Sequence, residues 1–237
     1  MLPERNRPLT LDPDEILARI DGTLPVVQTD KNAHLWARHP EDYYTEPEWC
    51  SERLFATEHF EGTIVDPSCG SGRIVLAARA HREKAKKIGD HRIVKALGYD
   101  IVKRSKVCGA ELEDFLTSDY ETDNIVSNPP FGLCAKSSTK NGLTEDFAYV
   151  KRALATAEKK VALLLPLPWL TGADKGEWLR TTPLAKVLII TPRPSMPPGP
   201  VIEAGLAPGG GTEDFAWMIW DHAHKGPPTL GWLNRDV

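Results

Sequence analysis

The chain has 237 residues, 41% of them hydrophobic and 26% charged, which is the composition of a globular protein with one sizeable core. A net charge of −4 excludes a uniformly basic nucleic-acid coat but permits a local basic face. No apolar run is long enough to span a bilayer, and the first residues lack a signal peptide's apolar core, so we expect a soluble cytoplasmic protein without a membrane partner. No two cysteines form a CxxC pair, so we expect no metal site.

The start of the chain is expected to precede the main domain. Residues 1–41 are interpreted as an N-terminal extension, and residues 42–237 as a single domain. A helix is predicted at about 47–59, because a proline stands at its first position and acids occupy its first turn. Tyr44 and Thr45 directly precede this helix, so they either belong to an ordinary helix start or line a ligand pocket.

A strand followed by a glycine turn and a helix comes next. The β-branched stretch 63–66 ends in Asp66, a Gly-x-Gly turn follows, and a helix is predicted over 73–82. This order indicates the first βα unit of a Rossmann-like sheet. The third glycine of a dinucleotide fingerprint is missing, since Val75 stands in its place, which disfavours a nicotinamide-dependent oxidoreductase. An acid before the turn would repel a pyrophosphate but suits a cationic ligand.

Two further acids are candidates for the ends of strands. Asp100 ends a predicted strand, where a carboxylate can accept hydrogen bonds from ribose hydroxyls. Asp114 and Phe115 could contact an adenine amino group and cover its ring, or Asp114 could be an ordinary helix-start acid. Basic residues cluster at 79–95 and at 103–106, either as solvated surface or as a contact to nucleic acid.

The stretch Asn128-Pro129-Pro130-Phe131 follows a short buried strand predicted at 125–127. Two prolines fix φ near −65° and remove two backbone donors, so the strand ends in a stiff turn. That turn offers carbonyl oxygens, one asparagine side chain and an aromatic ring. Two acceptors can take both N–H bonds of an amino group while the ring lies beside it. A plain strand-ending loop is the alternative.

The remaining pattern continues the alternation of helices and strands. Strands are predicted at 161–165, 187–190 and 215–220, and residues 192–212 form a loop rich in proline and glycine. Ligands bind at the carboxyl ends of the strands in open α/β sheets. Six predicted contacts would meet there: Asp66, Gly70, Gly72, Asp100, Asp114 and Asn128.

The order of these motifs resembles the S-adenosylmethionine-dependent amino-methyltransferases, particularly bacterial and phage adenine-specific DNA methyltransferases. The sequence DPSCGSG at 66–72 is similar to their cofactor loop, and Asp100 stands where their acid holds the cofactor ribose. Residues 114–115 match the pair that contacts the cofactor adenine, and 128–131 match the catalytic motif. Residues 44–47 resemble the N-terminal motif that closes over the methionine end of the cofactor.

This resemblance implies a Rossmann-like class I methyltransferase fold, with a mostly parallel sheet, helices on both faces and an antiparallel C-terminal strand. It implies S-adenosylmethionine as cofactor and methyl transfer to the exocyclic amino group of adenine in DNA, after the base has left the duplex. The implied cofactor-binding residues are Tyr44, Thr45, Asp66, Pro67, Cys69, Gly70, Gly72, Asp100, Asp114, Phe115 and Asn128. The implied catalytic residues are Asn128, Pro129, Pro130 and Phe131.

Two departures from the family leave the substrate open. No segment is long enough for a separate target-recognition domain, so a partner subunit could supply site recognition. Met196 stands where the family often has an aromatic residue that stacks the target base, so Lys136, Phe215 and Trp217 are further candidates for substrate binding. The alternatives are an RNA base or a protein glutamine as substrate, and a non-catalytic subunit that binds cofactor or nucleic acid. The basic clusters favour nucleic acid, with DNA as the leading partner.

Overall fold

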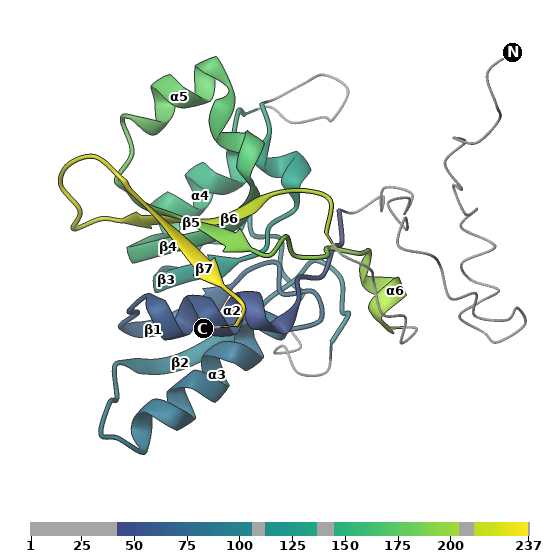
Figure 1. The fold of residues 1–237 in the computed structure, drawn as a ribbon, viewed down its shortest axis with the longest axis vertical. Coiled ribbons are helices and arrows are strands. Elements are labelled where there is room, and N and C mark those ends of the chain that lie inside the picture. Colours follow the sequence, from purple (N-terminus) through teal and green to yellow (C-terminus); the bar gives the residue numbers. More distant parts are fainter. Residues whose placement is uncertain (1–41, 106–111, 137–144, 204–210, 237) are drawn as a thin grey trace, which may run out of the picture.

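The computed structural model describes residues 42–105, 112–136, 145–203 and 211–236; the predicted extension at 1–41 lies outside these ranges. The described residues contain a seven-stranded sheet with the order β2-β1-β3-β4-β6-β5-β7 (Figure 1). Its strands are β1 (Gly62–Asp66), β2 (Ile93–Gly98), β3 (Thr122–Ser127), β4 (Ala157–Pro166), β5 (Leu184–Thr191), β6 (Phe215–Asp221) and β7 (Thr229–Asn234).

Every strand of this sheet runs in the same direction except β6. The pairs β1–β2, β1–β3 and β3–β4 are parallel, and β6 lies antiparallel between β4 and β5. The last strand, β7, pairs parallel with β5 at the edge. The predicted mostly parallel sheet with an antiparallel C-terminal strand is therefore confirmed.

Helices cover both faces of the sheet, as predicted (Figure 1). The helices are α2 (Glu48–Thr57), α3 (Arg73–Lys86), α4 (Ala148–Thr156), α5 (Ala173–Leu179) and α6 (Gly199–Glu203), with 3-10 turns η1 (Phe131–Cys134) and η2 (Leu167–Thr171). Side chains alternate between the two faces along β4: Ala162 and Leu164 join the core under α2 and α3, while Val161, Leu163 and Leu165 join the core under α4 and α5.

The proline-rich segment after β5 packs against the N-terminal motif. Thr45 N donates to the Pro197 carbonyl at 3.0 Å, and Gly199 N donates to the Tyr43 carbonyl at 3.0 Å. Part of this segment forms α6, so the predicted loop at 192–212 is more ordered than its composition indicated. The contact fixes the N-terminal motif over the carboxyl end of the sheet.

The segment after β2 differs from the sequence interpretation of an acid at a strand end. Leu112 forms only an isolated parallel bridge with Asp100, two residues before Asp114, and residues 106–111 lie outside the described ranges. Within the described chain, β3 follows β2 directly as the next strand in sequence. No helix in the described ranges is both long enough and apolar enough to cross a membrane.

Candidate functional site

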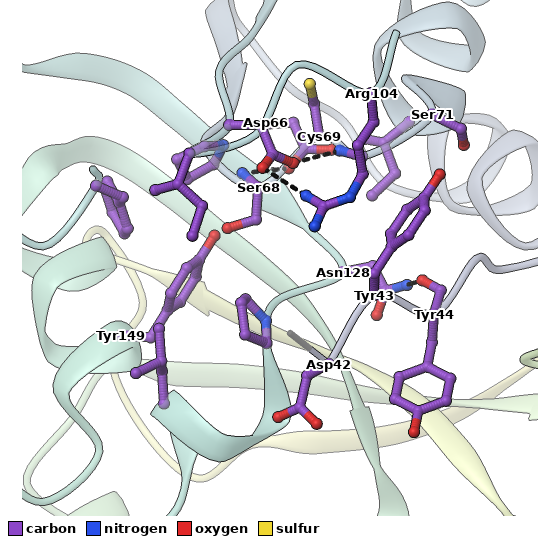
Figure 2. Close-up of a pocket in the computed structure, with 18 of the residues that line it drawn as sticks. Asp42, Tyr43, Tyr44, Asp66, Ser68, Cys69, Ser71, Arg104, Asn128 and Tyr149 are labelled. Carbon is purple, nitrogen blue, oxygen red and sulfur yellow. Dashed lines mark hydrogen bonds and ion pairs between the residues drawn. The ribbon is translucent and has the colours of Figure 1, made fainter. Parts of the chain in front are cut away.

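A cavity of about 250 Å³ opens where β1 and β3 end (Figure 2). In the strand order, β1 is followed along the chain by β2 in one direction, whereas β3 is followed by β4 in the opposite direction. Such a switch point is where open α/β sheets bind ligands. Ten of the eleven predicted cofactor residues line this cavity: Tyr44, Thr45, Asp66, Pro67, Cys69, Gly70, Asp100, Asp114, Phe115 and Asn128.

The glycine loop between β1 and α3 adopts a conformation that favours glycine. Gly70 has φ +49°, and a Cβ atom there would lie 2.7 Å from the Tyr43 ring. Gly72 has φ 87° and caps the start of α3, but it is the predicted cofactor residue that does not line the cavity. The loop therefore brings its backbone close to any ligand, with Tyr43 packed over it.

Asp100 ties the end of β2 to this loop. Its carboxylate accepts hydrogen bonds from Gly70 N at 2.8 Å and from Val102 N at 3.0 Å, and it pairs with Arg104 Nη1 at 2.9 Å. The Arg104 guanidinium also lies 4.5 Å from the centroid of the Tyr43 ring, and the two side chains lie against each other in Figure 2. Arg104 is thus engaged at the cavity wall rather than displayed on a nucleic-acid surface.

The larger basic cluster at 79–95 is remote from the cavity. It covers the C-terminal half of α3 and the start of β2, and β2 begins beside Gly62, at the amino end of β1. Arg79, one of its members, donates to the Ala96 carbonyl at 3.0 Å. Among the described residues of the two basic clusters, only Arg104 lines the cavity, where it is paired with Asp100, so a contact between these clusters and a nucleic acid stays a prediction.

The acid at the end of β1 is buried and part of a chain of hydroxyl groups. Asp66 is 1% exposed, and its Oδ1 accepts hydrogen bonds from Ser127 Oγ at 2.7 Å and Ser68 N at 3.2 Å. Tyr149 in turn donates its hydroxyl to Ser127 Oγ at 3.0 Å. Burial raises the pKa of Asp66 well above its ordinary value, and the nearby charge of Glu46 acts in the same direction.

The electrostatics of the cavity suit a cationic ligand. Its described lining holds five acids and one base, namely Asp42, Glu46, Asp66, Asp100 and Asp114 against Arg104. The hydroxyl of Thr45, a residue that is 3% exposed, is buried without a hydrogen-bond partner among the described residues. An unpartnered hydroxyl in the wall of a cavity can take a polar group of a ligand. A pyrophosphate would be repelled by this set of side chains.

Asn128 has its amide fixed in one orientation. Its Nδ2 donates to the Tyr44 carbonyl at 2.9 Å and to Glu46 Oε2 at 2.9 Å, and Figure 2 shows the amide beside the backbone of Tyr44. Both partners are acceptors, so the assignment of Nδ2 to this side is chemically determined. Its Oδ1 accepts no hydrogen bond from the described residues and remains an acceptor for a ligand.

The other members of the predicted catalytic turn lie close by. Pro130 lines the cavity, whereas Pro129 is buried and is not part of the lining. Phe131 is half-buried, with its ring nearly parallel to that of Tyr44 at 9° and a centroid separation of 6.3 Å. The Phe131 ring also lies 5.9 Å from that of Phe215. Tyr44, Phe131 and Phe215 therefore form an aromatic cluster beside Asn128.

The predicted substrate-binding residues do not line the cavity. Lys136 is exposed, and Met196 is half-buried against the core that also contacts Phe131. Phe215 is 3% exposed and reaches the site only through Phe131. Trp217 is fully buried, and its Nε1 donates to the Cys50 carbonyl at 3.1 Å, so it is a core residue and we correct its assignment as a residue that stacks the target base.

Neither a protein-family model nor a curated protein matches this chain in sequence, whereas solved structures resemble its fold. The M protein of the type I restriction enzyme EcoKI (EC 2.1.1.72) superposes with a TM-score of 0.52 at 16% identity. That match covers 81% of this chain and 48% of the M protein, so the chain spans about half of its length. PH1948 from Pyrococcus horikoshii, a proposed RNA methyltransferase, gives 0.51 at 12% identity over 89% of this chain and 98% of that one.

The fold is that of the Rossmann-like methyltransferases. At identities of 12–16%, these superpositions show the fold alone, and the chemistry is argued from the site itself.

Sequence reasoning missed several residues that this methyltransferase fold brings to the cavity. Glu46 stands inside the N-terminal motif, and its position directly before Pro47 was the one available signal. Asp42 has φ 50°, and its Oδ2 accepts from Gly132 N at 2.8 Å, which ties the N-terminal motif to the turn after Phe131. Tyr149 gave no signal, because an aromatic residue on an amphipathic helix is usually a core residue.

The raised pKa of Asp66 predicts a pH-dependent stability. Because the pKa is higher in the folded state than in the unfolded state, the contribution of Asp66 is complete at low pH and is lost as the pH rises through the folded-state value. We expect the Tm of Asp66→Asn to match wild type at about pH 4, near the ordinary pKa of an aspartate, and to exceed it by about 2–4 °C as the pH rises above that value. The exposed acid Asp119, changed to Asn, is the matched control. Thermal melts across this pH range that stay parallel for wild type and Asp66→Asn would contradict the prediction.

Proposed function

We propose that this chain transfers a methyl group from S-adenosylmethionine to an exocyclic amino group of a nucleic-acid base, with adenine in DNA as the favoured substrate. The observation that carries the proposal is the orientation of Asn128, whose amide hydrogens are both engaged while Oδ1 is left as an acceptor. The EcoKI M protein, a DNA adenine methyltransferase of the same fold, supports this choice of substrate.

The residues of the cavity fit the cofactor. Glu46 and Asp66 are acids that suit its sulfonium and ammonium charges, Thr45 offers an unpartnered hydroxyl, and Asp100 stands where ribose hydroxyls would bind. Phe115 lines the cavity, and its ring packs against the Tyr149 ring with a centroid separation of 4.9 Å. The adenine of the cofactor would lie against this ring, beside Asp114. When bound, S-adenosylmethionine supplies the activated methyl group.

The catalytic turn would act by holding the amine. Asn128 Oδ1 and the Pro129 carbonyl accept its two N–H bonds, which favours a pyramidal nitrogen with its lone pair directed into the cavity. The Pro130 carbonyl already accepts from Leu133 N at 3.0 Å, so Pro129 offers the neighbouring carbonyl. Because the turn and the amide are held before substrate arrives, little reorganisation is needed during the reaction.

The aromatic cluster would receive the base. Phe131 stacks on one face of a base that has left the duplex, and Met196 and Lys136 remain candidates for contacts at the rim. An RNA base is the second candidate substrate, because the match to PH1948 covers 98% of that proposed RNA methyltransferase. A protein glutamine is a further candidate, because its side-chain amide also carries a planar NH2 group with two N–H bonds. A non-catalytic partner subunit would have no use for the oriented amide, which disfavours that alternative.

The proposal is tested by offering labelled S-adenosylmethionine together with duplex DNA, single-stranded DNA, RNA or a protein lysate in parallel. We expect label in DNA, released as N6-methyladenine after digestion to nucleosides. Label that appears only in RNA or in protein would reassign the substrate. Cofactor binding by calorimetry without transfer to any of the four would contradict an amino-methyltransferase.

A further inference from the structure

A buried carboxylate stands behind the side chain that holds the amine. Glu46 is 5% exposed, and its Oε2 lies 2.9 Å from Asn128 Nδ2. The glutamate is held from both sides along the backbone: Thr45 N donates to Pro197 O at 3.0 Å, and Arg73 Nη1 donates to the Glu46 carbonyl at 2.7 Å. The carboxylate is therefore aimed at Asn128 by the frame of the fold.

Removing a carboxylate from water is costly unless it is paired and hydrogen-bonded. The described contacts give the Glu46 side chain a hydrogen bond to the Asn128 amide, and the nearest cation, Arg73, donates to its backbone instead. A glutamine would fill the same space without the cost of a buried charge. An acid in this place is thus better explained by its effect on Asn128 than by packing.

We propose that Glu46 is a positioning residue that acts through Asn128, fixing its amide with Oδ1 towards the amine and increasing the negative charge on that oxygen. The inference rests on the proposed function. Two physical effects support it. The Tyr44 carbonyl engages only one Nδ2 hydrogen, and the Glu46 carboxylate engages the other and would repel Oδ1 if the amide turned over. Donation to a carboxylate also polarises the amide, so Oδ1 becomes a stronger acceptor as the amine nitrogen gains positive charge.

Protonation of Glu46 would remove both effects. Burial raises the pKa of Glu46 above its ordinary value, while the hydrogen bond from Asn128 and the charge of Arg73 oppose that rise. The other titratable groups that interact with Glu46 are Asp66 and Cys50. Because Asp66 titrates in the same cavity, the wild-type pH profile alone does not isolate Glu46, and a comparison with a variant is needed.

The test compares Glu46→Gln, Glu46→Ala and the control Glu48→Gln, an exposed acid in the first turn of α2. Glu46→Gln keeps the volume and one acceptor but loses the charge, so at saturating cofactor we expect kcat to fall about 10-fold, with KM for the nucleic-acid substrate within a few-fold. Glu46→Ala should lower kcat about 100-fold, and Glu48→Gln should match wild type. The acidic limb of the kcat–pH profile should lose its Glu46 component in Glu46→Gln. A Glu46→Gln enzyme with the rate and the pH profile of wild type would overturn the inference.

A measurement without substrate separates this inference from the proposed function. The side-chain amide protons of Asn128, assigned by NMR through the Asn128→Ala variant, should shift with pH in wild type and should shift much less in Glu46→Gln. If that coupling is seen while no amine is methylated, the proposed function fails and the contact stands. If the amide protons of wild type do not respond to pH while DNA is methylated, the role of Glu46 fails and the function stands.

Discussion

Asn128→Ala is expected to lower the rate of methyl transfer by about 10²–10³-fold while the affinity for S-adenosylmethionine stays within a few-fold of wild type. The variant removes Oδ1, the acceptor that the fold leaves for the amine. The glycine loop, Asp100 and residues 114–116 also line the cavity and are untouched by this change. Single-turnover transfer of labelled methyl, with cofactor affinity from calorimetry, measures the two effects separately.

Asn128→Asp sharpens this test, because it keeps the oxygen and removes the donors. An aspartate at this position would place a second carboxylate where Nδ2 now lies, 2.9 Å from Glu46 Oε2. Like charges this close cannot both stay ionised, so we expect transfer to fall to a similar extent. Asn234→Ala, an exposed asparagine on β7, is the control and should transfer at the wild-type rate. Wild-type transfer by Asn128→Ala would overturn the proposed mechanism.

The turn at Asn128 and the alternation of strands and helices could be predicted because the rules behind them are local. Two prolines fix the backbone wherever they stand, and β-branched runs next to amphipathic segments define βα units. The contact between Glu46 and Asn128 joins residues 82 positions apart and exists only because the N-terminal motif folds back over β3. No local pattern encodes that return.

The error at Trp217 has the same origin. An aromatic residue in a strand after the catalytic turn fits either a base-stacking role or a core role. The choice depends on whether the face of β6 that carries the residue is covered by a helix or open to a ligand. The strand lies between β4 and β5 with both faces covered, so Trp217 joins the core beside α2, and Met218 joins the core on the other face. A run of buried residues on both faces carries no periodicity from which the sequence could have distinguished these roles.

Asp100→Ala is expected to weaken the binding of S-adenosylmethionine by about 10–100-fold, because hydrogen bonds to a charged group contribute about 1.5–3 kcal/mol. The loss has two parts. The variant removes the acceptor proposed for the ribose hydroxyls, and it also frees Gly70 N and Arg104, which Asp100 now holds at 2.8 and 2.9 Å. The glycine loop therefore loses part of its support. Asp119→Ala, at an exposed acid, is the matched control and should bind with wild-type affinity.

At saturating cofactor, Asp100→Ala should transfer methyl at close to the wild-type rate, the reverse of the result expected for Asn128→Ala. This opposition follows from the geometry of the cavity: Asp100 lies at the end of β2 against the glycine loop, and Asn128 lies past the end of β3 against the N-terminal motif. Calorimetry gives the affinity, and initial rates at raised cofactor concentration give kcat. Unchanged affinity in Asp100→Ala would remove Asp100 from the cofactor site. A loss of kcat that excess cofactor does not restore would instead place Asp100 in the part of the cavity that holds the amine.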